Sequence, residues 1–309
     1  LQSCTTGSSN VAIGDYALTT QTTTSNNTAV GTQALRYNTT GTNNTAVGYL
    51  ALDANTTGQQ NNAFGDNALG GNTTGSYNVA VGEQSLYNNN ASDNTGCGHR
   101  TLQQNTTGTL NTAVGGNALD ANTTGSSNVA VGNNALGVNT TADNNTAVGR
   151  SALSDNTTGH SNTAVGSKAL DAITTAQGCT AVGFEALTTC TGEANTGVGR
   201  KVMDDLSTGI QNTALGYDAG GDLTTGSNNT LLGYGAGGSS SPSGSLTGSN
   251  NRVVLGNNNI THLYCADTSI SSSDARDKTD VADFTKGLDW VKALRPVSYT
   301  HLRAHETAS

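Results

Sequence analysis

A glycine recurs at an almost constant spacing of seventeen residues along most of this chain, with two steps of sixteen, from Gly82 to Gly98 and from Gly183 to Gly199. A nearly fixed phrase, N-T-A-V-G-x-x-A-L-x-x-N-T-T-G, surrounds each glycine. Such self-similarity indicates an array of one small unit, so a rod is a better first hypothesis than a globular enzyme. The repeat glycines are Gly14, Gly31, Gly48, Gly65, Gly82, Gly98, Gly115, Gly132, Gly149, Gly166, Gly183, Gly199, Gly216 and Gly233.

The repeat length and its composition favour a β-solenoid. Asn, Thr and Gly dominate the repeat, and all three are weak helix formers. Heptads are absent, which argues against a coiled coil. Seventeen residues suit one coil of two short strands and two turns, stacked on the next coil at ~4.8 Å. We therefore predict an all-β fold, a parallel β-solenoid or β-roll over residues 1–233.

Apolar residues recur at fixed places in each repeat, and we expect them to form the interior. They are the residue before the glycine, such as Val47, the small residue before that, such as Ala46, and an Ala-Leu pair such as Ala51-Leu52. Each coil then offers about one Val, one Leu and two Ala, which is a thin core. Parallel strands from several chains are expected to bury one another's apolar faces, most simply in a homotrimer.

Asparagines and glycines mark the turns of the predicted coil. An Asn lies four residues before most repeat glycines, as Asn27 and Asn44 do, and in-register stacking would join these amides into a ladder. A second Asn series, including Asn38, precedes Thr-Thr-Gly and predicts the other turn. The repeat glycine is expected where the backbone turns or where a Cβ would strike a neighbouring coil.

Charge and composition narrow the function classes. The net charge is −9 without any Lys/Arg cluster, which argues against nucleic-acid binding. No run of about 18 apolar residues is present, so no membrane insertion is expected. The five cysteines show no metal-ligand spacing, and repeat positions such as Cys97 and Cys179 indicate small buried residues. His301 and His305 are interpreted as surface residues, and we expect neither metal nor cofactor.

The regular pattern ends after Gly233. Residues 234–250 are Gly/Ser-rich and predict a loop, and residues 251–272 predict a degenerate coil followed by a strand at Ile260–Tyr264. Charged residues become dense from Ser273, and a helix with one apolar face is predicted over Val281–Leu294, before Pro296.

Two runs in this last part carry a family resemblance. They are Ser272-Ser273-Asp274-Ala275-Arg276-Asp277-Lys278-Thr279-Asp280 and Ala293-Leu294-Arg295-Pro296-Val297-Ser298-Tyr299. Together they resemble the start of the intramolecular chaperone domain that ends many phage tailspikes and tail fibres, best known from the endosialidase C-terminal peptidase family. The repeats are similar to the head repeats of trimeric autotransporter adhesins, and N-T-A-V-G-x-x-A-L is common in phage fibre proteins. The resemblance implies a left-handed β-roll in a homotrimer.

The chaperone resemblance also implies self-cleavage, the only enzymatic activity expected of this chain. Ser273 would be the nucleophile and Lys278 its base, with Asp274 and Arg276 in support and the cut between Ser272 and Ser273. A serine hydroxyl needs such a base, and a lysine serves when its pKa is lowered. The family's domain continues well beyond the second run, so residues 273–299 are interpreted as the start of a truncated chaperone domain and residues 300–309 as an artefactual tail.

These observations favour the structural shaft and host-recognition part of a viral tail fibre, located in the virion. Its partners would be two further copies of the chain and a host cell-surface glycan or protein receptor, contacted through irregular parts such as residues 234–250. The main alternative is a bacterial surface adhesin of the trimeric autotransporter type, located outside the cell. A polysaccharide depolymerase is less favoured because the repeats hold few carboxylates and aromatics. An ice-binding solenoid ranks last because Thr-Thr sits at a turn.

Overall fold

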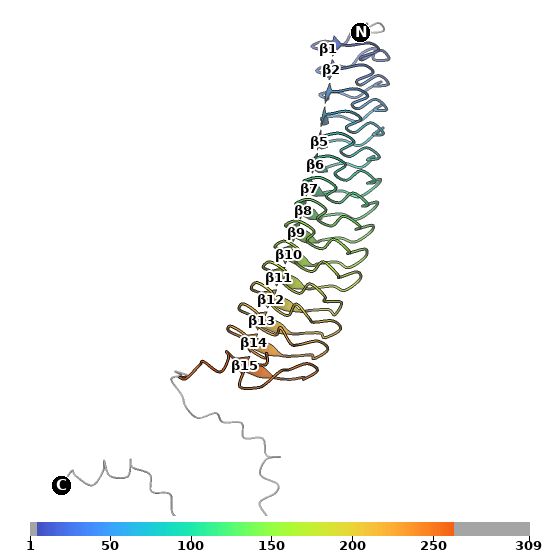
Figure 1. Ribbon diagram of the computed structural model, residues 1–309. Coiled ribbons are helices and arrows are strands. Elements are labelled where there is room, and N and C mark those ends of the chain that lie inside the picture. The colour runs from blue at the N-terminus through green and yellow to red at the C-terminus, as the bar shows by residue number, and fades with distance from the viewer. Residues whose placement is uncertain (1–4, 263–309) are drawn as a thin grey trace, which may run out of the picture. The chain divides into compact units, whose positions relative to one another are not determined.

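The computed structural model describes residues 5–262, which wind into one stack of coils (Figure 1). Each coil contributes one three-residue strand, and the strands pair in sequence order into a single parallel sheet of 15 strands. Residues 5–262 contain no helix, so the predicted all-β parallel solenoid is confirmed. The strands are β1 Val11–Ile13, β2 Thr28–Val30, β3 Thr45–Val47, β4 Asn62–Phe64, β5 Val79–Val81, β6 Thr95–Cys97, β7 Thr112–Val114, β8 Val129–Val131, β9 Thr146–Val148, β10 Thr163–Val165, β11 Thr180–Val182, β12 Thr196–Val198, β13 Thr213–Leu215, β14 Thr230–Leu232 and β15 Val253–Leu255.

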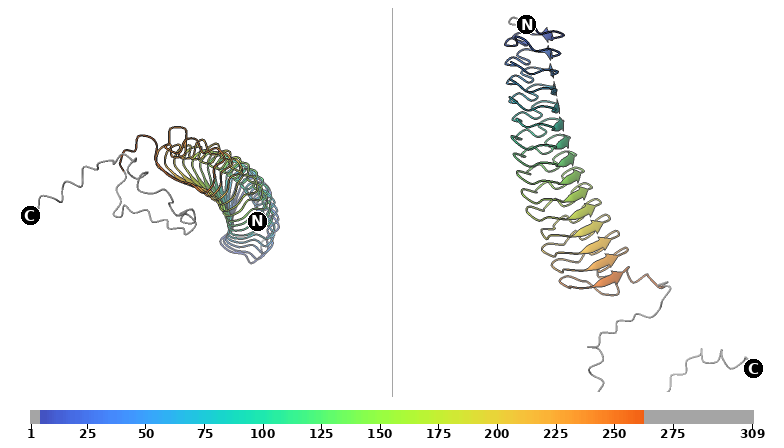
Figure 2. Two further views of the ribbon diagram at one scale, coloured as in Figure 1. Left: turned by 90° about the horizontal axis from the view of Figure 1, so that it is seen from below. Right: turned by 180° about the vertical axis from the view of Figure 1, so that it is seen from behind.

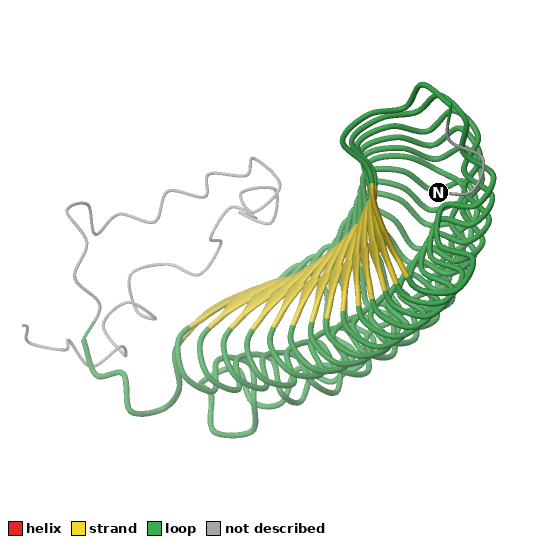
Figure 3. Cartoon of the chain, turned by 90° about the horizontal axis from the view of Figure 1, so that it is seen from above, coloured by secondary structure: helices red, strands yellow, loops and turns green. Residues whose placement is uncertain are grey.

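The strands stay in register although the coils differ in length. Thr28 of β2 pairs with Thr45 of β3, one full repeat later. At the two shorter steps the same strand positions still pair, as Thr180 does with Thr196. The last pairing, of Thr230 with Val253, spans the Gly/Ser-rich segment. Viewed along the stack, the coils follow one outline that turns gradually from coil to coil (Figures 2 and 3). Turns and loops therefore absorb every change in length.

Alanine and leucine form the interior. The central alanine of most strands, such as Ala46, is fully buried, and so is the Ala-Leu pair after the glycine, such as Ala51 and Leu52. Both predictions are confirmed. The predicted burial of the residue before the glycine is wrong, because Val81 and Val165 are more than one third exposed. Side chains alternate along a strand, so burial of the central alanine directs both of its neighbours outward.

The second strand predicted for each coil is absent from the described residues. The Ala-Leu side of the coil is a run of turns in which Gln33 has φ 62° and Leu35 has φ 50°. Such positive φ values are uncommon for non-glycine residues. Stacking compensates for them, because the Leu35 N–H donates to the Ala51 carbonyl of the next coil at 3.0 Å. This side is therefore held by hydrogen bonds between turns instead of a second β-ladder.

The repeat glycines fill the place predicted for them. Gly149 has φ +135°, a conformation that side chains rarely adopt. A Cβ there would lie 2.5 Å from the carbonyl carbon of Gly166 in the next coil. Both the backbone conformation and the close approach of the next coil therefore require glycine.

Two asparagine ladders run through the interior, the first of which was predicted as a ladder and the second only as a turn. In the first ladder the Asn44 N–H donates to Asn27 Oδ1 at 3.0 Å, and Asn44 Nδ2 donates to the Gly58 carbonyl at 2.9 Å. In the second, Asn55 Nδ2 donates to Asn38 Oδ1 at 2.9 Å. The side chains are buried, so they supply hydrogen bonds that water cannot reach. The second ladder ends at Asn156, after which its position holds Ile173, Cys190, Leu206 and Leu223, all buried.

Residues 234–250 form an ordered excursion between β14 and β15. The Leu246 side chain is buried, and its N–H donates to the Gly237 carbonyl at 3.0 Å. Ser241 Oγ donates to the Gly256 carbonyl at 3.2 Å. Beyond β15, residues 260–262 have no strand conformation, contrary to the strand predicted from Ile260. The remainder of that strand and the predicted helix lie outside the described residues.

Candidate functional surfaces

The most extended surface feature is the outer face of the sheet. We define the outer sheet face as the side chains that flank the buried central residue of each strand, β1 to β15. Its exposed apolar members are 36–73% accessible to solvent. Because the strands pair in register, these side chains lie above one another along the whole stack. They are Val11, Ile13, Phe64, Val81, Val114, Val165, Leu215, Leu232, Val253 and Leu255.

Thr and Cys side chains also lie on the outer sheet face. The first strand position is usually a half-buried Thr, as at Thr112 and Thr146. Cys97, at the end of β6, is exposed, so the prediction that it is buried is wrong. It occupies the same outward position as the valines of the neighbouring strands β5 and β7. The face is therefore a long stripe of small and apolar side chains.

A second feature is an aromatic–arginine column, which we define as Phe184, Arg200, Tyr217 and Tyr234. Each directly follows a repeat glycine, in four successive coils. Arg200 Nη1 donates to the Tyr217 hydroxyl at 3.0 Å, and its guanidinium carbon lies 5.7 Å and 5.3 Å from the ring centroids of Phe184 and Tyr217. The Tyr217 and Tyr234 rings stack at 5.5 Å with an interplanar angle of 15°. The three aromatic side chains remain 42–60% exposed.

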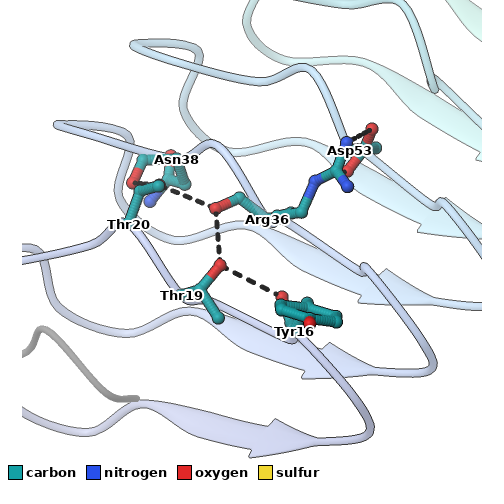
Figure 4. Close-up of polar contacts among 6 residues, drawn as sticks. All are labelled: Tyr16, Thr19, Thr20, Arg36, Asn38 and Asp53. Carbon is teal, nitrogen blue, oxygen red and sulfur yellow. Dashed lines mark hydrogen bonds and ion pairs between the residues drawn. The ribbon is translucent and has the colours of Figure 1, made fainter.

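An ion pair joins two adjacent coils near the N-terminal end (Figure 4). Arg36 Nε lies 3.1 Å from Asp53 Oδ1, and its Nη2 donates to Asp53 Oδ2 at 3.2 Å. Burial raises the pKa of Asp53, an effect that Arg36 opposes. Thr19 and Thr20 donate to the Arg36 carbonyl at 3.4 Å and 2.7 Å. These contacts tie coils together, which is a structural role.

Several other carboxyl groups on the coils show the same burial effect. Burial raises the pKa values of Asp120, Asp171, Asp204 and Asp218 above the ordinary value. Neighbouring carboxylates add to the effect on Asp171, Asp204 and Asp218. Across residues 5–262 there is no pocket and no group of three or more His, Cys, Asp or Glu arranged for a metal ion. The same residues contain no helix long and apolar enough to cross a membrane.

The predicted self-cleavage residues Ser272, Ser273, Asp274, Arg276 and Lys278 lie outside the described residues, as do His301 and His305. Two features of the described part escaped the sequence predictions. The aromatic–arginine column has a signal in the sequence, since one position of the repeat is bulky in four successive coils. The approach of the buried Cys179 and Cys190 thiols to one carbonyl oxygen, that of Gly192, has a weaker signal, because the two cysteines lie at different positions of the repeat.

Comparison with known proteins bears on the C-terminal part alone. Residues 273–308 match the family described as the chaperone of endosialidase. The match begins at Ser273, includes Lys278 and continues beyond Tyr299 to residue 308. It supports the chaperone part of the resemblance. Among curated proteins nothing matches this chain. The likeness of the repeats to phage fibres and adhesin heads stays a prediction.

Proposed function

We propose that this chain is the structural shaft and host-recognition part of a viral tail fibre, assembled as a homotrimer and located in the virion. The observation that carries the proposal is the outer sheet face, an apolar stripe along a regular rod-like stack, in a chain whose C-terminal segment matches the chaperone of endosialidase. A uniform stack of coils suits a part that sets length and stiffness.

The outer sheet face supports association of three parallel chains. Soluble monomers rarely expose a continuous apolar surface of this kind, and larger patches mark interaction sites. Each strand directs two side chains outward, and the first is commonly a short Thr, so sheets from neighbouring chains can approach closely. A second chain in the same register would present the same stripe at every level. The predicted left-handed winding and the threefold arrangement come from the adhesin-head resemblance.

The C-terminal segment would act in assembly. In the proposed reaction Ser273 Oγ attacks the Ser272 carbonyl carbon while Lys278 takes the hydroxyl proton and passes it to the leaving Ser273 nitrogen, with Asp274 and Arg276 in support. Water then hydrolyses the resulting ester, which leaves a carboxylate on Ser272 and restores the Ser273 hydroxyl. Intact-mass measurement tests this step. A product ending at Ser272 should form from the wild-type chain and disappear in the Ser273→Ala and Lys278→Ala variants. Persistence of that product in Ser273→Ala would assign the cleavage to another protease.

Host contact is proposed for the aromatic–arginine column together with the adjoining loop 234–250. Exposed Tyr and Arg side chains commonly dominate binding surfaces. The ligand would be a cell-surface glycan or protein receptor. Retention of the chain on a panel of immobilised bacterial surface glycans and on whole cells tests this proposal. The double variant Tyr217→Ala with Tyr234→Ala should lose retention, whereas Tyr77→Ala, a Tyr elsewhere whose 51% exposure lies between theirs, should keep it. Equal retention of both variants would remove the column from the proposal.

The bacterial adhesin remains the second candidate, because the repeat resemblance applies to it equally. The chaperone match favours the viral fibre.

One pair of matched variants tests the association directly. Val165 on the outer sheet face and Val138 on a turn are both exposed, at 36% and 42%. Val165→Asp places a charge in the proposed interface, whereas Val138→Asp places it outside. Light scattering at micromolar concentration should give three chain masses for wild type and Val138→Asp, and a lower mass for Val165→Asp. An unchanged mass in Val165→Asp, or a monomeric wild type, would contradict the proposal.

A further inference from the structure

Two buried cysteines meet inside one coil. Cys179 immediately precedes β11, and Cys190 lies in the turn that follows this strand. Both side chains are fully buried. Cys179 Sγ donates to the Gly192 carbonyl oxygen at 3.2 Å, and Cys190 Sγ donates to the same oxygen at 3.4 Å. The two sulfurs therefore lie around one carbonyl oxygen.

In this coil a cysteine stands at the position of each of the two asparagine ladders. From Asn10 to Asn229, Cys179 is the single position of the first ladder without an amide side chain. The Cys179 N–H still donates to Asn162 Oδ1 at 2.9 Å, but Cys179 has no amide oxygen to offer to Asn195 in the next coil. Cys190 lies on the second column, beyond its last asparagine, Asn156. This coil therefore contributes no side-chain amide to either of the two asparagine ladders.

We propose that Cys179 and Cys190 form a disulfide within this coil when the protein meets an oxidising low-molecular-weight disulfide such as oxidised glutathione. The bond would join the start of β11 to the following turn, where the amide ladders are missing. It is independent of the proposed function, since it concerns the closure of one coil and not the outer sheet face.

The environment of the two thiols favours one order of the reaction. The neighbouring Cys190 thiol lowers the pKa of Cys179, with help from the backbone N–H groups of Asn195 and Ala194, against the effect of burial. The neighbouring Cys179 thiol, together with burial, raises the pKa of Cys190. In the closed coil this favours Cys179 as the first nucleophile, because the thiolate is the attacking species, and when the coil opens either cysteine can attack first with the same products.

The exchange proceeds in two balanced steps. The Cys179 thiolate attacks one sulfur of oxidised glutathione, an Sγ–S bond forms, the glutathione S–S bond breaks, and one glutathione thiolate leaves. Cys190 then loses its proton and attacks Cys179 Sγ, which forms the Sγ–Sγ bond and releases the second glutathione thiolate. The two thiol protons end on the two glutathione molecules, which are the reduced product, and the cysteine pair is oxidised by two electrons.

The sequence around the pair makes the bond simple to detect. No Lys or Arg lies between Ala169 and Val198, so trypsin releases both cysteines in the one peptide 169–200. Glu185 lies between them, so a second cut after Glu185 separates the two cysteines unless they are bonded. The full chain is equilibrated with oxidised glutathione at the urea midpoint of unfolding, where the coil opens and recloses, and free thiols are then blocked by alkylation.

The proposal predicts that peptide 169–200 loses two hydrogen masses, takes up no alkyl group, and stays joined after the cut at Glu185 until a reductant is added. The oxidised chain should also unfold at higher urea concentration than the reduced chain. Cys179→Ser and Cys190→Ser should each abolish both effects, and Cys97→Ser, at an exposed position, should abolish neither. Two alkylated thiols or two glutathione adducts on peptide 169–200 would overturn the proposal.

Discussion

Replacing one asparagine of the first ladder should test how the stack is held together. Asn128 is fully buried in the middle of the array. Its Oδ1 accepts from the Asn145 N–H at 3.0 Å, and its Nδ2 donates to the Ala142 carbonyl at 2.8 Å and to Asn111 Oδ1 at 3.2 Å. The Asn128→Ala variant keeps the backbone but removes all three side-chain bonds.

The expected loss of stability follows from the groups left behind. The Asn145 N–H would be buried without a partner, whereas the Ala142 carbonyl would keep the bond from Asn139 Nδ2 at 3.2 Å. One such group costs about 1–3 kcal/mol, so the variant should lose about 2 kcal/mol of unfolding free energy. The exposed Asn133, whose Nδ2 donates to the Gly116 carbonyl at 3.1 Å, provides the matched control. Asn133→Ala should lose less than about 0.5 kcal/mol, as surface substitutions generally do.

The measurement is urea unfolding followed by far-ultraviolet circular dichroism, with all variants at one chain concentration because association contributes to apparent stability. A loss below about 1 kcal/mol for Asn128→Ala would refute the reasoning, because it would place the buried partners within reach of water. Equal losses for Asn128→Ala and Asn133→Ala would refute it as well.

Two further predictions concern the repeat glycines and the buried carboxyl groups. Gly178→Ala should lower the unfolding free energy by about 1 kcal/mol, and Gly149→Ala by several times as much, because both glycines have positive φ but only Gly149 faces the next coil. Equal losses in thermal unfolding would show that the close approach of the next coil is unimportant. Folding raises the pKa values of Asp120, Asp171 and Asp218 above 3.8, so their contribution to stability is fully present below that pH and is lost as pH rises through the folded values. The melting temperature should therefore be higher near pH 4 than at pH 8, with a smaller difference in Asp120→Asn, and a rise in melting temperature with pH would contradict this assignment.

Much of the fold could be predicted from the period alone. A fixed repeat length fixes in-register stacking, and stacking then explains the buried leucines, the asparagine ladders and the glycines that no other residue can replace. These features share one cause, since each position meets a copy of itself in the next coil. A single strong periodicity therefore carried most of the information.

The direction of the valines could not be predicted in the same way. In a strand such as Val79–Val81 every residue is apolar, so the sequence does not show which side of the strand faces inward. The narrow interior settles the question, because it accommodates Ala80 and leaves both valines outside. The turns near Leu35 were missed for a related reason, since leucine gives no sign of a positive φ.

The candidate functional surfaces also differ in how far the sequence alone could predict them. The C-terminal chaperone could be predicted because its residues form a specific phrase, which the family match supports. The aromatic–arginine column depends on contacts between coils, such as that of Arg200 with Tyr217, which only become visible once the coils are stacked. The meeting of Cys179 and Cys190 at the Gly192 carbonyl likewise requires the coil to close on itself.

The central claim is that three chains meet through their outer sheet faces, and Cys97 offers the most direct measurement. It is exposed on that face at the end of β6, so in three parallel chains in register its thiol would meet its two copies. Treatment of the native protein with a trifunctional maleimide, followed by a denaturing gel, should give a covalent species of three chains that disappears in Cys97→Ser. Chains that carry the maleimide at Cys97 yet migrate singly would contradict the claim.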